Sequence, residues 1–447
     1  MLKILANKTY AQLFTAQIVA LLGTGLLTVA LGLMAYDLAG DAAGLVLGGA
    51  LTIKMVAYVV LSPVANALFG RFNRKHVLII ADLVRALVAL LLPFVDAIWQ
   101  IYVLIFILQT ASASFTPTFQ ATIPDILPDE KDYTKALSLA RLAYDLENII
   151  SPSMAGLLLT VVSYHWLFSG TALGFVLSML LIIAARFPAA ATAAAQKEQS
   201  FKQRLTRGIR IYLATPRLRG LLALNFVASA SSAMVIVNTV VIVRGTLSGS
   251  ESDVAIGFAA YGLGSMISAL ALPNLLENYS DRPVMMAGAT ATTAGLTLFG
   301  VYLLSGGGIG WTILLVTWLG FGLCYSMILT PSGRLLRRSS HSEDRPALFA
   351  AQFALSHGCW LITYPLAGWL GHAAGMGTAM LVLGLLSALA LVIGLYVWPR
   401  SAGAELEHSH EDLPPDHPHL KTHQGQGTTH RHAVVIDDEH RIWPTQG

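Results

Sequence analysis

The chain has 447 residues, of which 55% are hydrophobic and only 12% are charged, and its formal net charge is +3. A soluble domain carries about 25% charged residues, so this composition excludes an ordinary soluble protein and indicates a chain that is surrounded by lipid. The small positive charge fits basic loops beside a membrane and gives no indication of nucleic-acid binding.

The hydrophobic runs are long enough to cross a membrane as helices, each of which takes about 20 residues. Twelve such runs follow one another along the chain, at residues 10–36, 44–69, 77–95, 99–118, 136–160, 165–186, 219–243, 254–276, 283–304, 309–331, 346–370 and 376–398. We therefore predict an all-α membrane protein with twelve transmembrane helices.

Lysine and arginine mark the cytoplasmic loops of bacterial membrane proteins. Here they gather in alternate loops, for example at Arg71, Arg74 and Lys75, whereas the opposite loops hold acidic residues and essentially only Arg244. This placement predicts a multi-pass protein of the bacterial cytoplasmic (inner) membrane with both termini in the cytoplasm.

The order of these runs predicts four segments. Residues 187–215 pass from an alanine-rich stretch into a basic amphipathic sequence, which is typical of a linker that lies on the membrane surface. This linker would separate an N-terminal six-helix bundle, residues 1–186, from a C-terminal six-helix bundle, residues 216–399. Residues 400–447 would form a cytoplasmic tail that is disordered. Weakly repeated six-helix halves are typical of transporters, whose substrate site lies between the halves near mid-membrane.

Ionisable residues inside membrane spans are costly and usually functional. Lys54 lies in the middle of the second expected span. It could act in translocation as a charge partner, or it could form a structural ion pair with a neighbouring helix. Asp82 and Arg85 are three residues apart in the third span and are expected to form a structural pair on one helix face.

The fifth span is unusually polar, with Arg141 followed by Asp145, Glu147 and Asn148. Arg141 and Asp145 are four residues apart and could neutralise each other. Glu147 is then the candidate for exchanging a proton or binding a cation.

The eleventh span offers a counterpart in the other half. A shift of about 212 residues relates Asp145 to His357 and Glu147 to Cys359, so a divalent cation could be shared between the halves. Residues two apart point about 200° apart on a helix, however, and an unbroken helix cannot present both His357 and Cys359 to one ion. A hydrogen-bonded core histidine and a packed cysteine are the alternatives.

The tail is rich in possible metal ligands. Eight of the 13 histidines lie there among acidic residues: His408, His410, His417, His419, His423, His430, His432 and His440. Closely spaced histidine is a compositional signal for metal binding, and neutral imidazole suits nickel, cobalt, zinc and copper.

The loop after the second span resembles the signature loop of the major facilitator superfamily (MFS), Gly-x-x-x-Asp-Arg-x-Gly-Arg-Arg. Arg71, Arg74 and Lys75 match its basic positions, while Asn66 replaces the first glycine and Gly70 replaces the aspartate. The resemblance implies two pseudo-symmetric six-helix bundles. It makes Asn66, Arg71, Arg74 and Lys75 candidate residues of a gating loop, although the aspartate that helps to close that loop is missing.

Pro152 and Gly156 in the fifth span match positions of the antiporter motif of proton-coupled exporters. With its histidine-rich tail, the chain is similar to nickel-resistance exporters of the NreB type. This resemblance implies a monomeric secondary exporter of divalent transition-metal ions, nickel or cobalt, that works by proton antiport and confers metal resistance. No cofactor is expected, and no catalytic motif indicates an enzyme. The alternative is a multidrug or siderophore exporter of the same fold with an incidental tail, which an aromatic, acid-poor cavity would favour.

Overall fold

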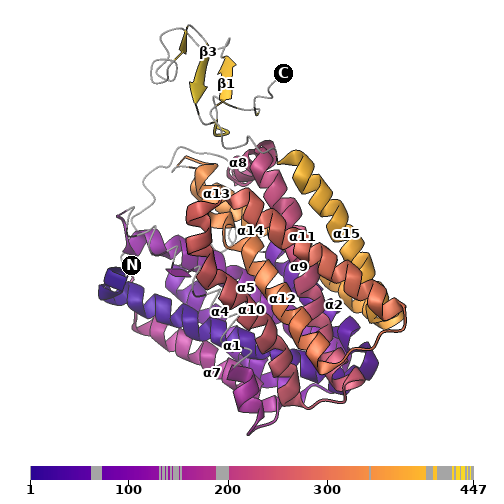
Figure 1. Cartoon of the computed structure of the whole chain (residues 1–447). Coiled ribbons are helices and arrows are strands. Elements are labelled where there is room, and N and C mark those ends of the chain that lie inside the picture. The colour runs from indigo at the N-terminus through magenta and orange to yellow at the C-terminus, as the bar shows by residue number, and fades with distance from the viewer. Residues whose placement is uncertain are drawn as a thin grey trace.

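The computed structural model describes residues 2–61, 73–129, 154–187, 201–341 and 344–398, several single positions between 132 and 151, and part of the tail. The described tail residues are 406–409, 425–426, 429–432, 434–437, 440 and 443. Helices make up almost all of the described chain, and the few strands lie beyond one end of the helical body, close to α8 and α13 (Figure 1).

The helices of the N-terminal bundle and the short turns between them are η1 (Leu2–Ala6), α1 (Lys8–Ala39), η2 (Gly40–Ala42), α2 (Ala43–Val56), η3 (Ala57–Leu61), α4 (Arg74–Leu91), η4 (Leu92–Phe94), α5 (Ile98–Ile126) and α7 (His165–Ala184). The linker holds α8 (Phe201–Ala214). The C-terminal bundle consists of α9 (Pro216–Val240), η5 (Val241–Thr246), α10 (Glu251–Asn278), α11 (Asp281–Leu304), α12 (Trp311–Leu329), α13 (Ser332–Arg338), α14 (Arg345–Ala373) and α15 (Gly375–Val397).

Among the described residues, nine helical segments are long and apolar enough to cross a membrane. The first, Lys8–Val60, has 53 residues and covers two of the expected spans. The expected eleventh span corresponds to α14, whose 29 residues include Pro365 inside the helix. The expected fifth span lies mostly outside the described residues. The fold is thus that of an all-α membrane protein with two helical bundles.

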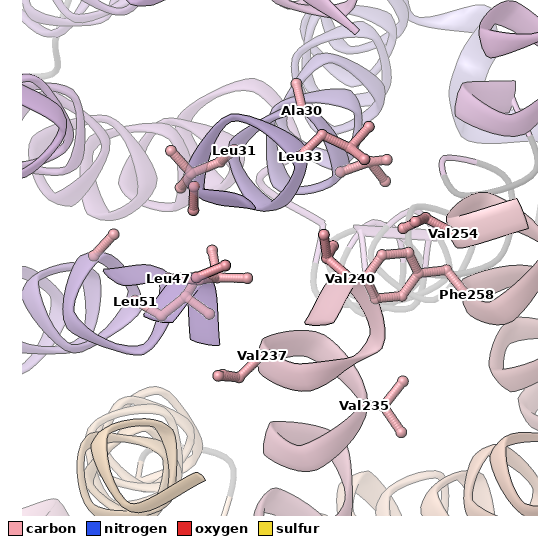
Figure 2. Packing of buried hydrophobic residues seen from close by; sticks show 14 of the residues in the cluster. Ala30, Leu31, Leu33, Leu47, Leu51, Val235, Val237, Val240, Val254 and Phe258 are labelled. Atoms are coloured by element: carbon pink, nitrogen blue, oxygen red, sulfur yellow. The ribbon is translucent and has the colours of Figure 1, made fainter. Parts of the chain in front are cut away.

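The largest hydrophobic core crosses from one bundle to the other. Leu31 of α1 and Leu47 of α2 belong to the same cluster of buried residues as Val237 and Val240 of α9 and Phe258 of α10. Figure 2 shows these side chains facing one another between the two pairs of helices. Because apolar surface is buried along this contact, it contributes to holding the bundles together.

Helices α2 and α14 approach one another closely between the bundles. A Cβ atom at Gly368 would overlap the carbonyl oxygen of Gly44, and one at Gly48 would lie 2.9 Å from the carbonyl oxygen of Tyr364. Asn238 of α9 is fully buried beside this contact and donates from Nδ2 to the carbonyl oxygen of Ala367 at 3.1 Å. Only glycine allows the two helix backbones to come this close.

Helix α8 packs on the C-terminal bundle, mainly against α14. Arg207 Nε lies 2.5 Å from Asp344 Oδ1, and the Tyr212 hydroxyl donates to Gln352 Oε1 at 2.5 Å. Burial raises the pKa of Tyr212 well above its usual range, because the charged phenolate is disfavoured away from water. The amphipathic linker that the sequence predicts is therefore docked by specific polar contacts.

Part of the tail is ordered into a small antiparallel sheet with strand order β1-β3-β2. Its strands are β1 (Leu406–Ser409), β2 (Gly425–Gln426) and β3 (Thr429–His432). After the sheet, Ile436 is fully buried in a cluster with residues of α8, α9 and α13. The sequence predicts disorder throughout this region, whereas these tail residues form strands and a docked segment.

Candidate functional site

A stripe of aromatic and imidazole rings runs along one face of α14. Phe353, His357, Trp360 and Tyr364 follow one another at spacings of four, three and four residues, which places them on the same helix face. The Phe353 and His357 ring centroids are 4.0 Å apart, and those of Trp360 and Tyr364 are 5.1 Å apart. The half-buried indole of Trp360 lies in the middle of the stripe.

This stripe meets the N-terminal bundle at η3. The Tyr58 ring lies 5.3 Å from the His357 ring and 5.9 Å from the Phe353 ring, measured between centroids. The Lys54 ammonium, on the last turn of α2, lies 5.7 Å from the centroid of the Tyr58 ring. Lys54 and His357 are thus brought to one place from different bundles, with Tyr58 between them.

On the side of the C-terminal bundle the rings continue into α12 and α10. Tyr325 lies 6.4 Å from Trp360, and Tyr261 lies 5.7 Å from Tyr325, between ring centroids. The site therefore presents a continuous set of aromatic faces with a cation and an imidazole at one end, which suits large apolar molecules that carry a few polar groups.

The imidazole of His357 has a defined hydrogen bond. Its Nδ1 lies 2.7 Å from the carbonyl oxygen of Phe353. Because a carbonyl oxygen only accepts, Nδ1 must carry the proton, and Nε2 of the neutral ring keeps its lone pair. His357 can therefore accept a hydrogen bond through Nε2.

Cys359 does not join this site. Its buried thiol lies 3.6 Å from the carbonyl oxygen of Leu355 and 3.9 Å from that of Leu222 on α9. The thiol thus faces α9, whereas the His357 ring lies beside Tyr58. This separation follows from the angle of about 200° between residues two apart on a continuous helix.

The predicted acidic residues of the fifth span, Asp145 and Glu147, lie outside the described residues, as does Asn148. Asn66 and Arg71 of the candidate gating loop also lie outside them.

The other two residues of that loop make contacts within the N-terminal bundle. Arg74 forms an ion pair with Asp125 of α5. The Lys75 ammonium donates to the carbonyl oxygens of Ile183 and Ala185, at 2.7 and 2.8 Å. These contacts connect the start of α4 to α5 and to the end of α7.

The structure describes four of the eight tail histidines. His408 and His430 are opposite one another in the pairing of β1 with β3, and His432 pairs with Leu406. His440 is 5% exposed, and its Nδ1 lies 3.1 Å from Asp437 Oδ1. The remaining predicted ligands, His410, His417, His419 and His423, lie outside the described residues.

Within the described part of the chain, no group of three or more His, Cys, Asp or Glu side chains is arranged to hold a metal ion.

The ion pair that the sequence predicts in the third span, between Asp82 and Arg85, is present. Arg85 forms an ion pair with Asp82, which also accepts from the Ser178 hydroxyl at 2.7 Å. The Arg85 guanidinium lies between the rings of Phe115 and Phe175, at 4.1 and 4.6 Å from their centroids.

Sequence reasoning missed most of the aromatic site. Its signal was the regular spacing of Phe353, His357, Trp360 and Tyr364. In an apolar membrane span, however, such residues face lipid as readily as a substrate path. Tyr58 carried no signal, because its position depends on how η3 meets α14.

Membrane-crossing helices in two bundles, with polar and aromatic side chains gathered where the bundles meet, define a membrane transport protein. The sequence model of the Major Facilitator Superfamily matches residues 13–241 and 221–435. The chain therefore belongs to the major facilitator superfamily.

Individual relatives are distant. The chain is similar to macrolide efflux protein A of Streptococcus pyogenes, with 24% identity over 298 residues, or 64% of this chain and 72% of the relative. It is also similar to an uncharacterized MFS-type transporter of Bacillus subtilis, YvqJ, with 21% identity over 368 residues, or 79% of this chain and 84% of the relative.

Solved structures agree on the fold. The nucleoside transporter NupG has a TM-score of 0.65 at 15% identity, and the match covers 87% of this chain and 98% of the NupG chain. A D-xylose-proton symporter has a TM-score of 0.65 at 12% identity, and the match covers 89% of this chain and 98% of the symporter chain.

Proposed function

We propose that this protein is a proton-coupled exporter of amphiphilic organic compounds in a bacterial cytoplasmic membrane. The observation that carries the proposal is the set of rings between the bundles, from Tyr58 through His357 and Trp360 to Tyr325. Aromatic faces bind apolar and cationic organic molecules by stacking and cation–π contacts, while Lys54 and His357 supply polar contacts that can orient them.

The chemistry of these side chains favours an organic compound over a bare metal ion. A transition-metal site needs several nitrogen, sulfur or oxygen ligands at once, and among the described residues such a group is not found. His357 has aromatic neighbours, and Cys359 faces α9. The macrolide efflux relatives support the same choice, because a macrolide is a large organic compound.

A second candidate is export of nickel or cobalt by proton antiport, with resistance to those metals as its result. It is favoured by the eight tail histidines and by the register that pairs His408 with His430 across β1 and β3. In this candidate Asp145, Glu147 and His357 would contact the ion inside the membrane, and the tail would capture it beforehand.

Accumulation in bacteria that lack their own drug pumps separates the two candidates. Cells that express the protein should hold less erythromycin, ethidium or doxorubicin than cells with an empty vector, while their nickel and cobalt contents stay the same. If nickel falls and none of the three organic compounds changes, the second candidate is correct and organic export is wrong.

Export has a direction, so it requires that the protein has one orientation in the membrane. We propose that both termini face the cytoplasm, because lysine and arginine gather in alternate loops and in the linker, as they do on the cytoplasmic side of membrane proteins. A reporter fused after Gly447 should be active only in the cytoplasm; activity in the periplasm would contradict this orientation.

We propose further that the protein works as a monomer. The protein mass of the purified particle, with the bound detergent subtracted, should then match the 47.8 kDa chain.

A further inference from the structure

A small polar pocket lies inside the N-terminal bundle, between α1, α2 and α5. Its polar lining is Thr24, Thr28, Lys54 and Gln109, and the rest of its wall is aliphatic. The cavity volume is about 10 Å³, which is about the room that one water molecule or one hydroxyl group takes. Lys54 also contacts Tyr58, so the pocket adjoins the aromatic site.

Gln109 is the unusual member of this lining. Its side chain is 4% exposed, and its Oε1 atom has no hydrogen-bond partner. A buried amide oxygen without a partner is costly, and most such groups in proteins are satisfied. An unsatisfied acceptor in the wall of a polar cavity therefore indicates a group that arrives from outside the protein.

The other polar side chains fix the chemistry of that group. The Thr24 hydroxyl donates to the carbonyl oxygen of Ala20 at 3.0 Å, and the Thr28 hydroxyl donates to that of Thr24 at 3.1 Å. With their protons engaged, both hydroxyl oxygens act only as acceptors in the pocket. The donors among the polar side chains that line it are the Lys54 ammonium and the amide nitrogen of Gln109.

A hydroxyl group meets all of these conditions. It can donate to Gln109 Oε1 and accept from Lys54, and it has the right size. A ketone oxygen cannot donate, and a carboxylate is too large and would face acceptor oxygens. A water molecule has the same hydrogen-bonding chemistry, so an experiment must distinguish a hydroxyl of the cargo from water.

We propose that this pocket binds a hydroxyl group of the transported compound and that Gln109 selects for it. The proposal rests on organic export as the function. Loss of the acceptor should then remove the preference for the hydroxyl-bearing compound and leave transport of its deoxy analogue unchanged.

Doxorubicin and daunorubicin provide the test, because they differ by one hydroxyl group. In proteoliposomes with an imposed pH gradient, the wild-type protein should transport doxorubicin with a KM about fivefold lower than that for daunorubicin, as expected for one neutral hydrogen bond. Gln109→Leu should raise the doxorubicin KM to the daunorubicin value. Gln17→Leu is the matched control, since Gln17 of α1 is also buried with an unpartnered Oε1 but does not line the pocket; it should keep the preference.

Each outcome is decisive. Equal KM values in the wild-type protein, as for a pocket that holds only water, or a preference that survives in Gln109→Leu, would overturn the proposal while organic export stands. Transport of neither compound would overturn organic export of this kind and the pocket's role with it. Gln109→Leu removes an unsatisfied buried group, so the unfolding temperature of this variant should be no lower than that of the wild-type protein.

Discussion

At the scale of single residues, the indole of Trp360 is the centre of the proposed site, because its ring connects Tyr364 to Tyr325. The same helix carries Trp369, which is 55% exposed on the outside of the bundle. The two indoles thus share a helix and a residue type but not an environment.

This contrast gives a first prediction. Trp360→Ala should reduce transport of ethidium about tenfold, because it removes the largest ring of the site, and Trp369→Ala should leave it close to normal. The measurement is initial efflux rate in cells with matched amounts of each variant. Equal loss in both variants would indicate damage to α14 rather than to a substrate site.

The buried pair in α4 gives a prediction about stability. Asp82→Asn leaves the Arg85 guanidinium buried without its anionic partner, which typically costs about 3–5 kcal/mol. Asp125→Asn is the control, because the Arg74–Asp125 pair is exposed by 43% and 42%, and such pairs contribute about 0–1 kcal/mol. In detergent, the unfolding temperature should fall strongly in Asp82→Asn and only slightly in Asp125→Asn. Similar unfolding temperatures would mean that the rings of Phe115 and Phe175 hold Arg85 unaided.

At the scale of elements, the linker helix and the end of the tail share one hydrophobic cluster. Ile436 packs with Ile211 of α8, Leu218 of α9 and Leu335 of α13. Polar contacts surround it: His341 Nε2 lies 3.2 Å from Asp437 Oδ2, and the guanidinium of Arg217 lies 5.6 Å from the centroid of a Trp443 ring. The chain thus returns to the helical body after the sheet.

Ile436→Asp should release this end of the tail, since it places a charge in an apolar cluster. Limited proteolysis of the purified protein should then remove the tail several times faster than in the wild-type protein. Ser409→Asp changes an exposed residue of β1 and should leave the cleavage rate unchanged. If both variants are cut like the wild-type protein, the docked segment contributes little to holding the tail.

The elements also show what sequence can and cannot predict. Long apolar runs predict membrane helices, because backbone groups in lipid must be satisfied within the helix, and α4, α11 and α15 lie where hydropathy places them. The strands of the tail were not predicted, since a segment of His, Pro and Gly lacks the alternation of apolar and polar residues that marks a strand. Docking of Ile436 depends on a surface formed by distant helices.

At the scale of the whole molecule, the sequence predicts which residues lie in the membrane but not which of them meet. Lys54 was a candidate from its cost in lipid and His357 from its relation to Asp145 in the other half, and the structure brings them together through Tyr58. His357 and Cys359 were both candidates, and their positions on an unbroken helix separate them. Contacts between the bundles are set by tertiary packing at positions such as Gly48 and Gly368, which no local pattern reveals.

The tail can be tested against transport without disturbing its docked end. Replacing the seven histidines from His408 to His432 with asparagine retains Ile436 and His440 and should leave ethidium efflux unchanged. Under the second candidate the same variant should lower nickel tolerance. Loss of ethidium efflux would show that these histidines take part in organic transport, contrary to the proposed function.

The most direct test of organic export is flux driven by a proton gradient in a purified system. In proteoliposomes with an acidic interior, the protein should concentrate ethidium inside, collapse of the gradient with an ionophore should abolish uptake, and Trp360→Ala should reduce uptake about tenfold. Uptake of nickel under the same gradient, with no uptake of ethidium, doxorubicin or erythromycin, would contradict the account.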